Sequence, residues 1–575
     1  MRRARTLGWL LALTLTGCSG QIGEAGGAAA AAADRAADER SNDPDGVGPG
    51  EDGTDPDGVA PGEMPECTGD SRLLRPQVRR LTPLQHRNTL ESAFGMTFAD
   101  DALPNFEDAN PTIGLANDPR KMGVTTVTID SVYSSVRSVA STVTAQYPPV
   151  VDCLAAAGTQ CFADVIDSVG LALWRRPVLD SERDELLAGV DAVALETGTR
   201  TEQMQFVLQA LLMSPNMLYR TEIGDGPGEL TQLSSYELAS LLSYTLGERP
   251  PDAELIALAD SDALRDPDTL QAQTERLMDD PRFADSLAAF LWDYLKLENI
   301  DDVPKADRYG LTFAARVALG ESARATLMAK LRAPDADLMD VFRGQDFQMN
   351  AEAAAFFGSS DPALTGEHTA VTADDAQREG ILSHPAFLAV HAGEGSTGIV
   401  KRGVFTLEQL LGFDLPDPPD NVSGVELADL PEFDPETTSS RELHEITHSR
   451  QARCASCHVA IDPAGFGYEN WDPVGRFQLT EKQDVTIDAS GEYTVGEETF
   501  AFLDSVDYVR VLADSPSMRS TVLLNYFTYA MGQSGDGCEV LEFDEAVSSE
   551  GDGLRALAGN IVQTASFGER EAELE

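Results

Sequence analysis

Basic residues are scarce in this sequence of 575 residues. It carries 42 Lys and Arg against 96 Asp and Glu, which gives a formal net charge of −54. A surface of this sign repels phosphate, so the sequence excludes a nucleic-acid-binding protein and argues against electrostatic docking on anionic lipid. Aromatic residues are also few, at 7%, but 42% hydrophobic and 24% charged residues are ordinary for globular proteins. This composition excludes collagen, a coiled coil and a wholly disordered chain.

Long hydrophobic runs are absent except for one near the start. The apolar stretch Leu7 to Leu15 follows a basic segment and is too short to span a bilayer core of about 30 Å, so we expect an export signal. Leu15-Thr16-Gly17-Cys18 resembles a bacterial lipobox, which predicts a signal peptide over 1–18 and acylation of Cys18. Ser19 then favours an outer-membrane lipoprotein facing the periplasm or the cell surface. A plain secretory signal with an incidental cysteine is the alternative.

Residues 19–74 have almost nothing that could form a core. They are rich in Ala, Gly, Pro and acidic residues, and DPDGVGPGE at 43–51 recurs as DPDGVAPGE at 55–63. Such a segment cannot offset its ordering entropy by burial. The repeat lacks the further acidic ligands of a calcium loop. We therefore expect a disordered acidic linker that acts as a tether.

From about residue 75 onward the pattern is mainly helical. Apolar residues recur on one helical face around 204–212 and again around 283–295. Stretches rich in Val, Ile and Thr are few, such as Val124 to Ile129. Nucleotide-binding loops, nucleophile elbows and HExxH metal motifs are not found. The fold class we expect is mainly α.

The chain has only seven cysteines. With Cys18 assigned to lipid, Cys153 and Cys161 are spaced for a local disulfide in an oxidising compartment. Cys67 and Cys538 could pair with each other, but connectivity cannot be read from a sequence. The last two cysteines belong to the motif described next.

Cys454-Ala455-Ser456-Cys457-His458 has the spacing of a c-type haem attachment site. The thiols of Cys454 and Cys457 can add to the two vinyl groups of one porphyrin, and His458 can bind the iron. A zinc ribbon would need a second ligand pair nearby, and a thioredoxin-like pair would need a βαβ setting. A structural disulfide remains an alternative. The predicted cofactor is one covalent haem c, with His458 as its metal ligand.

The chemistry of such a haem depends on its sixth ligand, the residue that binds the iron on the face opposite His458. A sixth ligand makes an electron carrier, whereas an open position allows oxygen or peroxide chemistry. Met518 and His448 are the main candidates, Met531 is more typical of a core position, and the iron can also lack a sixth protein ligand. We expect Asp462-Pro463 and Gly465 to turn the chain directly after the haem helix.

The flanks of the motif carry a resemblance to the uncharacterised multi-domain secreted cytochrome family of planctomycetes and myxobacteria. Its parts are known as domains of unknown function 1587, 1595, 1592, 1588 and 1585. Two positions depart from the family pattern, with Gln85-His86 in place of Glu-Tyr and Gln533 in place of Arg. The matching segments are, in chain order, Arg79–Thr82, Trp174–Pro177, Ser214–Arg220, Ser234–Ala239, Leu291-Trp292, Arg378–Leu382, Lys401–Gly403, Pro418-Pro419, Thr437–Arg441, His448, Ile461–Gly467, Glu469–Asp472, Gly475-Arg476 and Tyr529–Gln533.

The resemblance implies five modules, at 75–150, 151–222, 228–356, 376–477 and 495–570, with the haem motif in the fourth. The expected protein is a multi-domain helical body with a C-terminal cytochrome c-like haem domain after a disordered tether. Its expected function is electron transfer or haem-based redox chemistry, more typical of a carrier than of an enzyme, with an unidentified redox partner protein and a membrane contact through the lipid. The alternative is a cell-surface binding or scaffolding lipoprotein in which the motif is structural.

Overall fold

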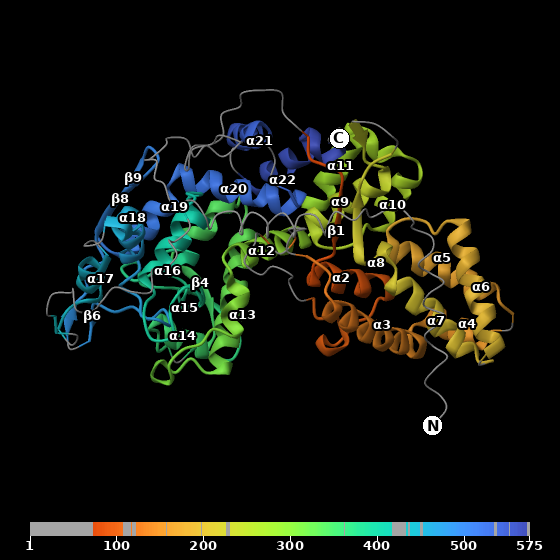
Figure 1. The fold of residues 1–575 in the computed structure, drawn as a ribbon, viewed down its shortest axis with the longest axis horizontal. Helices are drawn as coiled ribbons and strands as arrows, with labels where there is room; N and C mark the ends of the chain where they lie inside the picture. Colours follow the sequence, from red (N-terminus) through yellow and green to blue (C-terminus); the bar gives the residue numbers. More distant parts are fainter. Residues whose placement is uncertain are drawn as a thin grey trace, which may run out of the picture. The chain divides into compact units, whose positions relative to one another are not determined.

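The computed structural model describes residues 73–106, 115, 117, 122–156, 158–196, 198–225, 230–361, 363–416, 433–434, 437–448, 452–482, 484–533, 537–550 and 553–571. The described chain is mainly helical (Figure 1), as the sequence predicts. Cys18, Cys67 and the linker expected over 19–74, apart from its last two residues, lie outside the described residues. None of the described helices is both long enough and apolar enough to cross a bilayer.

The first part of the described chain is a helical group that begins and ends on a strand. β1 and β2 pair in antiparallel register, with Arg79 opposite Arg220. The elements of this group are β1 (Gln77–Arg80), α2 (Pro83–Phe94), α3 (Thr126–Gln146), α4 (Pro148–Ala155), α5 (Gln160–Trp174), α6 (Asp180–Glu196), α7 (Arg200–Met213), α8 (Pro215–Leu218) and β2 (Tyr219–Glu222).

This group has its own hydrophobic core. The predicted stripe on α7 is confirmed, because Met204, Val207 and Leu211 are fully buried there against α3 and α5. Cys153 of α4 and Cys161 of α5 form a disulfide at one edge of this core. The modules expected at 75–150 and 151–222 therefore share one core.

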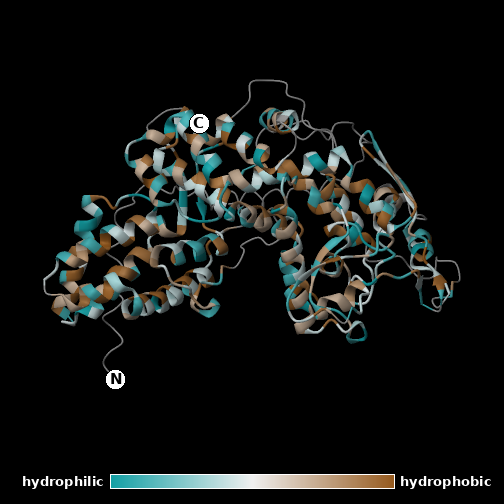
Figure 2. Ribbon diagram, turned by 180° about the vertical axis from the view of Figure 1, so that it is seen from behind, coloured by the Kyte–Doolittle hydropathy of each residue, from teal (hydrophilic) through white to brown (hydrophobic). Residues whose placement is uncertain are grey.

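The second part runs from 230 to 571 and shares a larger core. Hydrophobic and hydrophilic residues alternate along the same helices (Figure 2), as expected for helices with one buried face. Its first half contains β3 (Leu230–Gln232), α9 (Ser235–Gly247), α10 (Ala253–Asp260), α11 (Pro267–Met278), α12 (Arg282–Tyr294), α13 (Phe313–Leu331), β4 (Asp346–Met349), α14 (Ala351–Phe357) and β5 (Thr369–Thr372).

The second half of this part supplies the elements around the haem motif. α16 continues without a break into a π-helix, Phe405–Leu410. The elements are α15 (Pro385–Val390), α16 (Ile399–Val404), α17 (Ser440–His448), α18 (Ala452–Phe466), β6 (Thr480–Glu481), β7 (Val485–Thr486), β8 (Gly491–Val495), β9 (Glu498–Phe502), α19 (Ser505–Ala513), α20 (Pro516–Met531), α21 (Gly537–Glu550), α22 (Leu554–Gln563), α23 (Ala565–Gly568) and β10 (Glu569–Glu571).

Buried charges tie the two parts together near the strand pairs β1–β2 and β3–β10. Arg79 Nε donates to Glu222 Oε1 at 2.9 Å, and Arg570 Nη2 donates to Glu222 Oε2 at 2.7 Å. All three side chains are at most 1% exposed. Although burial raises it, the two guanidinium groups lower the pKa of Glu222 to about 2. A carboxylate between two buried cations is fixed in its charged form.

Candidate functional site

The motif residues 454–458 lie in the first half of α18, so Cys454, Cys457 and His458 share little more than one helical turn. Cys457 is half-buried and packs against the larger core. The expected turn directly after the motif is wrong. α18 continues through Asp462, Pro463 and Gly465 to Phe466, because Gly465 serves a helix crossing there.

α18 is positioned by a close crossing with α16. A Cβ on Gly403 would lie 2.1 Å from the carbonyl oxygen of Ile461, and a Cβ on Gly465 would lie 2.1 Å from that of Ile399. Only glycine fits at these two points. Arg402 Nη1 donates to the carbonyl of Tyr468 at 3.0 Å and so fixes the chain after α18 on the same helix.

α17 is held beside α18 by residues of the following strands. The backbone N–H of Ser440 donates to the Glu481 carboxylate at 2.7 Å, which satisfies a free N–H of the first helical turn. Arg441 donates to the carbonyl of Ser490 at 2.5 Å and lies 4.7 Å above the ring of Phe466. These contacts place His448, the last residue of α17, against α18.

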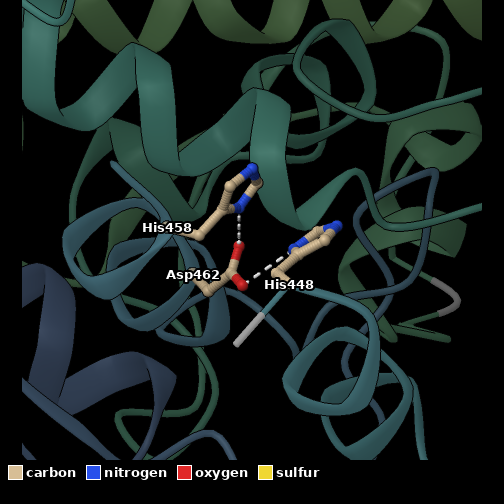
Figure 3. Close-up of side chains that lie close together, drawn as sticks. All are labelled: His448, His458 and Asp462. Atoms are coloured by element: carbon tan, nitrogen blue, oxygen red, sulfur yellow. Dashed lines mark hydrogen bonds and ion pairs between the residues drawn. The ribbon is translucent and has the colours of Figure 1, made fainter. Parts of the chain in front are cut away.

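Asp462 bridges two histidines at this junction (Figure 3). His458 Nδ1 donates to Asp462 Oδ1 at 2.8 Å, and His448 Nδ1 donates to Asp462 Oδ2 at 2.9 Å. Because an ionised carboxylate only accepts hydrogen bonds, each Nδ1 carries the proton that it donates, and in a neutral ring this leaves the lone pair on Nε2. The two rings nearly touch, with centroids 3.9 Å apart.

The site is charged and only partly open to water. The Asp462 side chain is 8% exposed, while those of His448 and His458 are 23% and 22% exposed. Burial raises the pKa of Asp462, but the hydrogen bonds from the two imidazoles hold it below its usual value. His444, one turn before His448, lies with its ring centroid 5.0 Å away, and burial lowers its pKa.

These residues fit a haem of the c type. Anchored through Nδ1, the ring of His458 leaves Nε2 as its coordinating atom, the pattern of metal-bound histidines generally. The half-buried Cys457 lies on the same helix. The arrangement also suits a single ion, because donor atoms of His448, His458 and Asp462 lie within 4.8 Å of one another.

The structure places the two candidates for the sixth ligand differently. In the described arrangement His448 contacts the ring of His458, so it would have to leave Asp462 to reach the opposite face of a porphyrin. Met518 is fully buried near the start of α20 in the larger core, and Met531 is fully buried at the end of that helix. Both His448 and Met518 stay predictions.

A groove lies on the side of α16 and the π-helix opposite α18. Its volume is about 550 Å³, and its walls include Lys296, His391, Lys401 and Phe405. The ring of His391 packs 3.9 Å from that of Phe405, and its Nε2 lies 3.0 Å from the carbonyl of Leu295. π-helical turns often accompany functional sites.

Sequence reasoning missed the role of Asp462, which it assigned to a turn. The signal was present in the spacing, because residues four apart on a helix share one face and His458 and Asp462 are so spaced. The contact with His448 could not be found in this way, since it depends on how α17 docks on α18.

Three family models match the chain. They are PSD5, "Protein of unknown function (DUF1595)", over residues 161–222; PSD4, "Protein of unknown function (DUF1592)", over 233–358; and PSCyt3, "Protein of unknown function (DUF1588)", over 378–481. The third match contains the CxxCH motif, His448 and Asp462. No curated protein and no solved structure matches the chain.

Proposed function

We propose that this chain, a member of the cytochrome-related multi-domain family that carries the DUF1595, DUF1592 and DUF1588 modules, is an exported c-type cytochrome that transfers electrons. The observation that carries the proposal is the position of CxxCH on α18, with the ring of its histidine held through Nδ1. The name of the third family model agrees with it.

Each residue of the site has a stated role in this proposal. Cys454 and Cys457 hold the haem as thioethers, and His458 binds the iron through Nε2. The haem supplies an iron that changes between two oxidation states. Asp462 keeps the proton on Nδ1 of His458 and thereby keeps Nε2 directed away from the carboxylate. Cys18 carries the lipid that tethers the body to the outer membrane, and a partner protein accepts or delivers the electrons.

The test is expression of the full chain with a cytochrome c maturation system. Covalent haem should appear on a denaturing gel and as a pyridine haemochrome spectrum, and its mass should be present in the intact protein. Cys457→Ala should lose or weaken the attachment, since each thioether is a separate bond. Cys153→Ala, a cysteine of the other core, is the matched control and should keep the haem. A wild-type mass without haem would overturn the proposal.

A second candidate function is a mononuclear metal site formed by His448, His458 and Asp462, favoured by the convergence of their donor atoms. Two histidines and one carboxylate are a common ligand set for divalent transition metals. Metal analysis of haem-free protein separates this candidate from the first. A chain that carries neither haem nor metal would be a scaffolding lipoprotein.

The membrane anchor has a test of its own. If Cys18 is acylated, Cys18→Ser should move the protein from the membrane fraction to the soluble periplasm or the medium. Several acyl chains hold a protein firmly, whereas a single chain binds only marginally. Continued membrane retention of this variant would contradict the anchor and leave the haem proposal intact.

A further inference from the structure

The Asp462 carboxylate has two oxygens and two imidazole donors. Oδ1 accepts from His458 at 2.8 Å and Oδ2 accepts from His448 at 2.9 Å. His458 and Asp462 come from one helix, while His448 comes from α17, so the carboxylate joins the haem motif to a second element. Asp462 is almost completely removed from water, at 8% exposed.

Hydrogen bonds to a buried carboxylate compete with one another. A donor on one oxygen withdraws charge from the other oxygen, and little water is present to level the difference. The bond from His458 is therefore weaker with His448 in place than it would be without it. A weaker acceptor on Nδ1 makes the ring a weaker electron donor through Nε2.

Resting on the haem function proposed above, we propose that His448 stays on Asp462 instead of binding the iron, and that Asp462 and His448 are positioning residues that set the donor strength of His458 and so tune the reduction potential of the haem. Asp462 lowers the potential, because an anionic acceptor on Nδ1 stabilises the oxidised iron. His448 opposes this effect by holding part of the charge of the same carboxylate. Through the hydrogen bond between His458 and Asp462, the two residues therefore shift the reduction potential in opposite directions.

Four substitutions separate these effects. Asp462→Asn keeps the shape and removes the charge, so the midpoint potential should rise. His448→Phe keeps a flat ring against His458 but removes the donor to Asp462, so the potential should fall. His448→Gln restores an N–H donor and should return the potential toward the wild-type value. Thr447→Val is the control on the same helix, because the Thr447 hydroxyl donates to the carbonyl of Leu443 and not to Asp462, so the potential of this variant should stay unchanged.

The double variant Asp462→Asn/His448→Phe tests whether His448 acts through the carboxylate. Its potential should equal that of Asp462→Asn alone, because the carboxylate charge that His448 shares with His458 is gone.

A second readout uses haem-free protein. In wild type the ¹⁵N resonances of His458 should report a protonated Nδ1, and in Asp462→Asn they should lose this preference.

The outcomes are distinct. Potentials that shift in opposite directions for the two single variants, with no further shift in the double variant, support the inference. Haem-loaded variants with unchanged potentials, shifts of the same sign, or a His448→Phe effect that persists beside Asp462→Asn would overturn it and leave the haem function standing. Wild-type protein without haem would overturn both.

Discussion

Arg570 on the last described strand donates to Glu222 on β2, 348 residues earlier, at 2.7 Å. The same carboxylate accepts from Arg79 on β1, so one buried side chain joins three distant segments of the chain. The contact joins β1 and β2 of the first part to β10 of the second part. Buried hydrogen bonds from Gln85 and Asn88 of α2 to Glu248 join the same two parts.

Removal of the charge of Glu222 should be strongly destabilising. Glu222→Gln removes the carboxylate that lies between the buried side chains of Arg79 and Arg570, and breaking a buried pair in this way costs about 3–5 kcal/mol. The free energy of unfolding, measured by denaturant titration, checks this. Asp279→Asn, which breaks the exposed pair with Arg555, should cost about 1 kcal/mol or less. Equal losses in the two variants would contradict the structural role of Glu222.

Low pH should reduce the difference in the free energy of unfolding between wild type and Glu222→Gln. The folded-state pKa of Glu222, about 2, lies below its ordinary value of 4.5. Its contribution to stability is therefore complete above about pH 4.5 and is lost as the pH falls toward 2. The stabilities of wild type and Glu222→Gln should differ most at neutral pH and approach each other over this acidic window. A difference that stays constant from pH 6 to pH 3 would contradict the pairing.

Unlike Glu222, Glu469 should lower the stability of the fold as the pH rises. Burial raises the pKa of this 4%-exposed carboxyl group from 4.5 to about 7, and Oε1 has no hydrogen-bond partner. An acid with a raised folded-state pKa opposes folding increasingly as the pH rises from about 4.5 to 7. Glu469→Gln should therefore be more stable than wild type at pH 8, by up to about 3 kcal/mol, with little difference at pH 4.5. Urea titrations at these two pH values check the prediction, and a variant that loses stability at pH 8 would refute it.

The close crossing of α16 and α18 predicts that alanine substitution destabilises the protein at Gly403 but not at Gly559. In Gly403→Ala the new Cβ would meet the backbone carbonyl of Ile461, which cannot move aside as a side chain can, so we expect a loss of about 1–3 kcal/mol. In Gly559→Ala on α22 nothing lies within 4 Å of the new Cβ, and the better helix propensity should add about 0.5–1 kcal/mol. Thermal unfolding of both variants provides the measurement. A Gly403→Ala protein as stable as wild type would exclude the close crossing.

The disulfide between Cys153 and Cys161 should stabilise the first core without any effect on the haem motif. The two residues are 8 apart, and closing a loop of this size contributes about 2.5 kcal/mol. The double variant Cys153→Ser/Cys161→Ser should lose this amount in denaturant titration and should keep the covalent haem proposed above. Loss of haem from correctly exported double variant would show that the two regions are coupled.

The helical fold could be predicted where periodicity was strong. The stripe on α12 is confirmed, with Phe283, Leu287, Phe290 and Leu291 all buried. The β-branched stretch from Val124 to Ile129 gave no such signal, because local propensity there favours extended structure. α3 nevertheless begins at Thr126, since the valines that follow at helical spacing are buried against α7.

Buried arginines could not be predicted, because composition places charged residues at the surface. Arg378 and Arg402 are at most 1% exposed and donate to backbone carbonyls, such as those of Ser383, Gly475 and Tyr468. They lie in the segments that carried the family resemblance. At these positions the segments that carry the resemblance pack the chain around the site. The site itself contains CxxCH and Asp462.

The strand pair β3–β10 has a consequence for the biogenesis of the protein. Gln232 lies opposite Glu569, so this strand pair cannot form until more than three hundred further residues have been synthesised. Contacts so distant in sequence form late in folding. The main neighbours of α18 are α16 and β8, which come from a much shorter stretch of the chain than the strand pair. The region around α18 can therefore assemble before the strand pair β3–β10 closes.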